Sequence, residues 1–109
     1  MLFRSYLLGR RELRGLALIM DVRHPMTDLD RTLIDFMVPT GKPVHVMLTK
    51  SDKLSNQAAR DTLAQVRAQL GAISKKHSVQ LFSSLKAQGI EDAEACFSQW
   101  LYPQPQFTA

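Results

Sequence analysis

Short apolar runs alternate along this chain with longer segments in which apolar residues recur every three or four positions. Three runs of four or five residues are almost wholly apolar: Leu16–Met20, Val44–Leu48 and Val79–Phe82. Such short runs, bounded by glycine, aspartate, threonine, lysine or serine, are typical of strands that are buried on both faces of a parallel sheet. We therefore predict three buried strands.

The segments around these strands show the helical repeat of apolar positions. We expect helices over residues 2–13, from about 27 to about 38, over about 56–71 and over 90–101. Thr27 and Asp30 resemble a capping box, and Ser55 or Asn56 can cap the third helix. The apolar faces of the last two helices are Ala59, Leu63, Val66 and Leu70, and Ile90, Ala93, Phe97 and Leu101.

The resulting order of elements, α-β-α-β-α-β-α, predicts an α/β fold with a parallel sheet covered by helices on both faces. We expect one domain over residues 1–102 and a flexible tail over 103–109, where prolines prevent a helix. The strand ends of a parallel sheet meet at one edge. Three segments should therefore lie together: Asp21–His24, Thr49–Asp52 and Ser83–Lys86.

The composition narrows the classes of protein to which this chain could belong. A chain of 109 residues with one cysteine has no disulfide framework, and its three histidines lack the spacing of metal ligands. No apolar run approaches the ~20 residues that span a bilayer, so we expect a cytoplasmic protein without a membrane partner. The net charge of +4 favours an anionic partner only weakly, although Arg10, Arg11 and Arg14 form a local cluster.

The segment Thr49-Lys50-Ser51-Asp52 follows the second predicted strand directly. An aspartate at such a strand end can accept the ring N–H and the exocyclic amine of guanine together, whereas adenine offers no such pair of donors. The alternative is an ordinary turn in which Asp52 or Ser55 caps the next helix. The position of Thr49–Asp52 after a buried strand favours guanine recognition over this alternative.

A second polar loop, Ser83-Ser84-Leu85-Lys86, follows the third predicted strand. A backbone N–H in such a loop can donate to the carbonyl oxygen of guanine, where adenine has no acceptor. In the loop after the first strand, Asp21 is expected to cap or pair locally and Pro25 to shape the backbone. A general-base role for His24 has little support, because no nucleophile or orienting partner is identifiable.

Taken together, these motifs resemble the EngB (YihA/YsxC) family of bacterial ribosome-biogenesis GTP-binding proteins. The matching segments are Asp21-Val22-Arg23-His24-Pro25 with Asp30, Leu48 to Leu54, and Phe82-Ser83-Ser84. The upstream segment Tyr6 to Gly15 is also similar. The resemblance implies a partial P-loop GTPase-type G domain, of which this chain matches the C-terminal half.

The resemblance implies a guanine-reading set of two loops: Thr49, Lys50, Ser51, Asp52, Phe82, Ser83, Ser84 and Leu85. It implies no catalytic residue and no metal ligand here, because the family holds phosphates and magnesium in segments that have no counterpart in these 109 residues. We expect this chain not to hydrolyse GTP, and to bind GTP or GDP weakly or undetectably.

The resemblance also implies biological partners. The parent family acts in assembly of the large ribosomal subunit and in cell division (septation). In the intact fold, the strand Leu16–Met20 would pair with the phosphate-loop strand. We therefore expect a truncated chain that forms a homodimer or a swapped assembly through this edge, or a marginally stable monomer.

Two other interpretations remain open. The chain could be a small basic α/β interaction module that contacts ribosomal RNA or protein without nucleotide, supported by the arginine cluster and the positive charge. It could also be an unrelated doubly wound enzyme domain with Thr49–Asp52 as a mere turn, but that requires a catalytic set, and none is identifiable.

Overall fold

The computed structural model describes residues 15–101, which form a three-stranded sheet flanked by helices. The strands are β1 (Leu16–Asp21), β2 (Val44–Thr49) and β3 (Ser78–Leu81). They lie in the order β1-β2-β3, and both pairs are parallel. The predicted strands are confirmed, with boundaries that differ by one residue. The helix expected over 2–13 and the tail expected over 103–109 lie outside the described residues.

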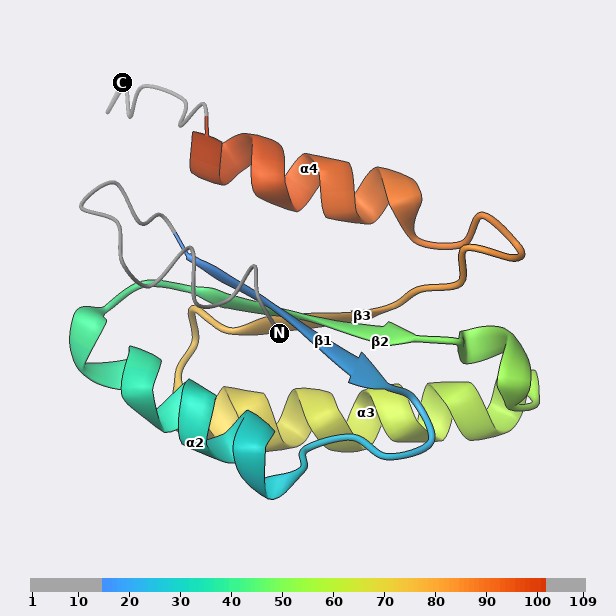
Figure 1. Ribbon diagram of the computed structural model, residues 1–109, viewed down its shortest axis with the longest axis horizontal. Coiled ribbons are helices and arrows are strands. Elements are labelled where there is room, and N and C mark those ends of the chain that lie inside the picture. Colours follow the sequence, from blue (N-terminus) through green and yellow to red (C-terminus); the bar gives the residue numbers. More distant parts are fainter. Residues whose placement is uncertain (1–14, 102–109) are drawn as a thin grey trace.

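Helices cover both faces of the sheet, as the sequence predicts. Helices α2 (Asp28–Met37) and α3 (Asn56–Ile73) lie on one face, and α4 (Ile90–Leu101) lies on the other (Figure 1). Two 3-10 turns, η1 (Val38–Thr40) and η2 (Ser51–Lys53), complete the connections. Helices on both faces of a parallel sheet are the arrangement that right-handed crossovers produce.

Local capping explains where the helices begin. The Thr27 hydroxyl accepts from the Asp30 amide and the Asp30 carboxylate accepts from the Thr27 amide, which is the predicted capping box. The Ser55 hydroxyl accepts from the Ala58 amide and caps α3. After α2 the chain turns through Gly41, whose φ of 70° suits a residue without a Cβ.

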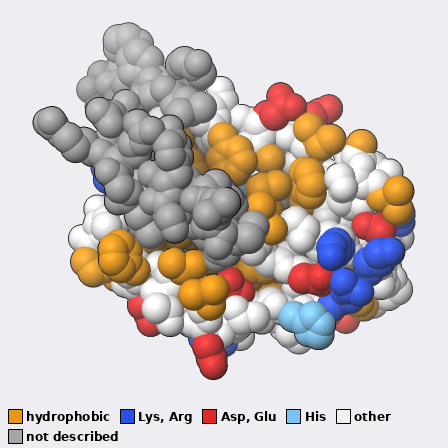
Figure 2. Space-filling view, viewed as in Figure 1, with side chains coloured by type: hydrophobic (Ala, Val, Ile, Leu, Met, Phe, Trp, Pro, Cys, Tyr) orange, Lys and Arg blue, Asp and Glu red, His pale blue; other side chains and the backbone are white. Residues whose placement is uncertain are grey.

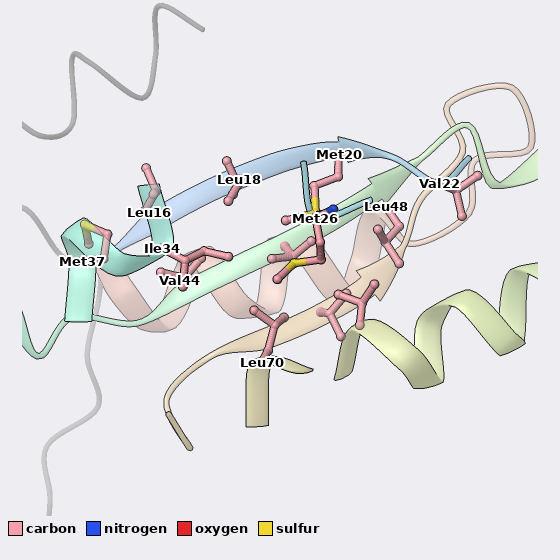
Figure 3. Packing of buried hydrophobic residues seen from close by; sticks show 13 residues of the cluster. Leu16, Leu18, Met20, Val22, Met26, Ile34, Met37, Val44, Leu48 and Leu70 are labelled. Carbon is pink, nitrogen blue, oxygen red and sulfur yellow. The ribbon is translucent and has the colours of Figure 1, made fainter. Parts of the chain in front are cut away.

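The hydrophobic core lies between the sheet and the α2/α3 layer. Every second residue of β1 and of β2 points into this core, as expected for a strand. Residues that are paired across the two strands point to the same face of the sheet. Ile34 and Met37 of α2 and Leu70 of α3 meet them (Figure 3). The strand residues that contribute are Leu16, Leu18, Met20, Val44, Val46 and Leu48.

The opposite face of the sheet is less apolar than predicted. On β1, which we expected to be buried on both faces, Ile19 is 37% exposed. On β2 and β3, the α4 side carries the buried polar residues His45 and Gln80. The prediction of burial on both faces is therefore wrong at Ile19 but confirmed at His45 and Gln80. These two polar side chains can be buried because they are hydrogen-bonded to each other.

Helix α4 has the predicted bounds, but its expected buried face is only partly correct. Ala93 is buried and Phe97 is half-buried, whereas Ile90 is 40% exposed.

Candidate functional site

The three loops that follow the strands meet at one edge of the sheet, at the right in Figure 1. The Val22 amide donates to the Thr49 carbonyl (3.0 Å), and the Ser51 amide donates to the Phe82 carbonyl (3.1 Å). These bonds continue the parallel ladder past the ends of the strands. The predicted common edge of Asp21–His24, Thr49–Asp52 and Ser83–Lys86 is confirmed.

The Thr49–Asp52 segment is fixed by contacts to both neighbouring loops. The Thr49 hydroxyl donates to the Met20 carbonyl (3.1 Å), on the β1 side. The buried Ser51 hydroxyl donates to the side-chain oxygen of Gln88, on the β3 side. Between them Lys50 has a left-handed backbone (φ 60°), an uncommon conformation for a residue with a Cβ. Strain of this kind persists where surrounding contacts hold the segment.

Asp52 is linked directly to the second loop. The Ser83 hydroxyl, which is fully buried, donates to the Asp52 carboxylate (2.7 Å) and accepts from the Lys86 amide (3.2 Å). The Ser83 bond lowers the pKa of Asp52 below its ordinary value, and Lys53 and Lys86 add to the effect. Asp52 is therefore an ionised acceptor at neutral pH.

The loop between Ser83 and Gln88 projects from the sheet as a closed turn. The Ser83 amide donates to the Gln88 carbonyl (3.0 Å), and the Gln88 amide donates to the Ser83 carbonyl (2.9 Å). Beyond this neck Ser84 is exposed and Leu85 is 78% exposed. The Ser84 and Leu85 amides have no hydrogen-bond acceptor among residues 15–101. They are donors available to a ligand.

Asp21 anchors a cluster of charged residues beside Thr49–Asp52. Its carboxylate accepts from the backbone amide, Nε and Nη2 of Arg23 at 2.8–3.0 Å, and lies 3.8 Å from the ammonium of Lys50. Hydrogen bonds from Arg23 hold the pKa of Asp21 well below its ordinary value. The predicted local pairing of Asp21 is confirmed. His24 is exposed, and its amide donates to the Asp21 carbonyl.

The structure thus places the eight predicted residues in three groups. Ser84, Leu85 and Lys50 are exposed, and Asp52 is half-buried. The remaining four residues hold the loops in place: Thr49, Ser51, Phe82 and the buried Ser83. The sequence prediction missed Gln88, which accepts from Ser51. Gln88 lies within the segment Phe82–Gly89 that resembles the family, but the sequence alone assigns it no role.

Basic residues surround the two aspartates. Arg23, Lys50, Lys53 and Lys86 all act on the carboxylates of Asp21 or Asp52. Figure 2 shows basic and acidic side chains gathered at this end of the molecule. Within residues 15–101 no group of histidine, cysteine, aspartate and glutamate side chains could hold a metal ion. Nor is any helix of this part long and apolar enough to cross a membrane.

Comparison with curated proteins gives strong matches, although no family model matches the chain. The chain is 55% identical over 98 residues to "Probable GTP-binding protein EngB" of Methylobacillus flagellatus, covering 90% of this chain and 47% of the relative. The proteins of that name from Azoarcus sp. and Coxiella burnetii are 56% and 44% identical, over 94% and 93% of this chain. The chain spans about half the length of each (49% in both).

Solved structures agree on the fold. Translation elongation factor SelB from Methanococcus maripaludis in its apo form has a TM-score of 0.78 at 15% identity, over 97% of this chain and 24% of that one. The same factor in complex with the GTP analogue GppNHp has a TM-score of 0.76. The fold is similar to part of the SelB structures, and the sequence is similar to about half of the proteins named "Probable GTP-binding protein EngB", which agrees with the predicted partial G-domain fold and with a match to one half of the family's proteins.

Proposed function

We propose that this chain is the guanine-recognition part of a GTP-binding protein. The observation that carries the proposal is the bond between Ser83 and Asp52, which joins the two loops and keeps an ionised carboxylate at the edge of the sheet. A carboxylate has about four lone-pair sites, so the bond from Ser83 leaves room for the ring N–H and the amine of guanine.

The second loop provides the complementary contact. The exposed Ser84 and Leu85 amides lack acceptors within the described residues, and either can donate to the guanine carbonyl oxygen. In this proposal the stem of Lys50 lies along the base plane, and Thr49, Ser51 and Phe82 fix the two loops. Adenine would leave both the carboxylate and the amide donors unsatisfied, which is the basis of selectivity.

We propose that this chain binds guanine nucleotides weakly and does not hydrolyse GTP. Much of the affinity for a nucleotide comes from phosphate and magnesium contacts, and the 109 residues contain no glycine-rich phosphate loop. The acidic residues of the described part do not fit a magnesium site either. In a protein of EngB length, phosphates and magnesium would be held outside the matched half.

Two measurements test this function. Calorimetry with GDP should show no tight binding, and a sub-micromolar dissociation constant would contradict weak binding. NMR titration with millimolar GMP should shift the amide signals of Asp52, Ser84 and Leu85, whereas AMP should leave them in place. Equal shifts with both nucleotides, or shifts only at other residues, would contradict guanine recognition.

For the whole protein we propose a role in assembly of the large ribosomal subunit, with a link to cell division, because the motifs resemble the EngB family. A cytoplasmic location follows from that role. Co-sedimentation with purified large ribosomal subunits tests the role in assembly. For an EngB-length protein, we expect binding to the subunit that responds to guanine nucleotide. Absence of binding to large subunits would contradict the role.

A second candidate function is a basic module that binds ribosomal RNA without nucleotide. The observation in its favour is the set of cations at the strand edge, Arg23, Lys50, Lys53 and Lys86. Arg10, Arg11 and Arg14 lie outside the described residues. Binding to ribosomal particles that weakens with salt, and that the substitution Asp52→Ala leaves unchanged, would favour this candidate. Loss of binding with Asp52→Ala would favour guanine recognition.

We also propose that β1 pairs with a second copy of this chain. Among the described residues only β2 pairs with β1, and the Leu16 amide donates to the Pro43 carbonyl on that side. In a parallel ladder the amides of Ala17 and Ile19 then point to the other side, where an unpaired edge favours association.

Light scattering after size-exclusion chromatography should therefore show a dimer or larger assembly. Ile19→Lys should shift it to monomer, because a charge on an edge strand opposes pairing. Ile73→Lys on α3 is the matched control, since Ile73 is 39% exposed and Ile19 37%. A stable, dilute monomer of the unmodified chain would contradict the proposal.

A further inference from the structure

A buried polar network lies between the sheet and α4. His45 is 5% exposed and Gln80 is 7% exposed, although both side chains are polar. The two ring nitrogens of His45 lie 2.6 Å from the Ser78 hydroxyl and 2.6 Å from the side-chain oxygen of Gln80. Phe97 of α4 packs edge-on against the imidazole ring at 5.7 Å. Buried polar groups of this kind are costly unless they are all satisfied.

The geometry assigns the direction of each hydrogen bond. The Gln80 amide nitrogen donates to the Leu81 carbonyl (3.1 Å) and to the Gly89 carbonyl (2.7 Å). Its oxygen must therefore face His45, and His45 Nε2 must carry the proton that it donates to this oxygen. All hydrogen-bonding groups of the Gln80 side chain are used, so its orientation is fixed.

On the side away from Ser78, this network ends at the Gly89 carbonyl, next to the base of the Ser83–Gln88 loop. Gly89 follows Gln88 directly, and its carbonyl also accepts from the Ala93 amide at the start of α4. Gly89 has φ 86°, and a Cβ there would lie 2.3 Å from the Leu81 carbonyl oxygen and 2.6 Å from the Gln80 amide nitrogen. The backbone therefore approaches Gln80 as closely as only a glycine allows.

The neck, which is the hydrogen-bonded pair of Ser83 and Gln88 at the base of the second loop, also contacts the Thr49–Asp52 loop. Gln88 exchanges two backbone bonds with Ser83, which holds Asp52, and its side chain accepts from Ser51. A displacement of Gly89 would move Gln88, and with it the exposed amides of Ser84 and Leu85.

We propose that Gln80, oriented by His45, is a positioning residue for the Ser83–Gln88 loop and thereby for the amides that this loop offers to guanine. The effect on guanine rests on the function proposed above, whereas the effect on the loop does not. Gln80 touches no ligand in this proposal and acts only through the carbonyls of Leu81 and Gly89.

Hydrogen exchange measured by NMR on the full chain without nucleotide tests the effect on the loop. Gln80→Met keeps the length of the side chain but removes both donors. It should speed exchange of the Ser83 and Gln88 amides about fivefold or more relative to the Val46 and Leu48 amides of β2, as expected from the loss of ordinary hydrogen bonds. Equal acceleration in the loop and in β2 would overturn the proposal, because it would show only a loss of stability.

Ser78→Ala is the matched control, because it removes a hydrogen bond from the same histidine at the end distant from Gly89. Ser78→Ala should change the amide exchange rates of the loop and of β2 by the same factor. A selective effect of Ser78→Ala on the loop would count against the proposed role of Gln80. If Gln80→Met does not fold, Gln80→Asn provides the test, since it keeps the amide but is one methylene too short to reach the Gly89 carbonyl. Unchanged loop exchange in Gln80→Asn would overturn the proposal.

Titration with GMP separates this inference from the proposed function. If guanine recognition holds, Gln80→Met should reduce the shifts that GMP causes at Ser84 and Leu85, while Ser78→Ala should not. If GMP shifts no loop amide even in the unmodified chain, the proposed function fails, but the exchange result still decides whether Gln80 positions the loop.

Discussion

The two faces of the sheet are built from different chemistry. Toward α2 and α3, β1, β2 and β3 present only apolar side chains, which form one continuous core. Toward α4 they present Ala17, Ile19, His45, Met47, Ser78 and Gln80, of which His45, Ser78 and Gln80 form a hydrogen-bonded polar network. Apolar burial is non-directional, whereas hydrogen bonds specify a geometry. We infer that the first face supplies most of the stability and the second fixes the loops at the strand edge.

The largest expected difference between the faces is in stability. Leu18 is fully buried in the core, and its neighbour Ile19 points to the other face with 37% of its area exposed. Leu18→Ala should lower the free energy of unfolding by about 2–5 kcal/mol, because it removes buried contacts and leaves a cavity. Ile19→Ala should cost clearly less. Urea denaturation of both variants measures this difference, and equal losses would show that the faces contribute alike.

A glycine substitution tests the polar face next. Gly89→Ala should lower the free energy of unfolding by about 2 kcal/mol or more, because a residue with a Cβ is strained at φ 86° and meets the Leu81 carbonyl. Gly71→Ala in α3 is the control, since nothing lies within 4 Å of its added Cβ, and it should stabilise the helix by up to about 1 kcal/mol. A neutral Gly89→Ala variant would show that the contact between β3 and the start of α4 is loose.

The smallest expected effect concerns pH and the charged loops at the strand edge. The folded-state pKa values of Asp21 and Asp52 lie below the ordinary value of 3.8, so their contribution to stability is present above that pH and is lost as pH falls below it. Asp21→Asn should therefore reduce the loss of stability on acidification, measured by urea denaturation from about pH 5 to about pH 2. Asp35→Asn, an exposed aspartate of α2, is the control, and identical acid profiles would contradict the role of Asp21.

Much of this fold could be predicted because its signals are local. The Thr27–Asp30 capping box, the Ser55 cap and the bounds of α4 all depend on residues close in sequence. The polar face could not be predicted in the same way. His45 lies within an apolar run, and the partners that satisfy the buried Gln80 include His45 on the neighbouring strand and the Gly89 carbonyl nine residues later.

The candidate site shows the same limit. The topology predicts that the three loops share an edge, since parallel strands end together. It does not predict that Ser83 rather than Ser84 holds Asp52, that Lys50 adopts a left-handed backbone, or that Gln88 joins the two loops. These features depend on how the loops pack against each other.

The central claim is that Asp52 selects guanine through two acceptor oxygens. Asn has one acceptor and one donor, which matches the ring N–H and the neighbouring carbonyl of xanthine instead of the two donors of guanine. NMR titration of Asp52→Asn with GMP and with xanthosine monophosphate tests the claim most directly. The account predicts that the shifts at Ser84 and Leu85 transfer from GMP to xanthosine monophosphate, and unchanged shifts with GMP would contradict it.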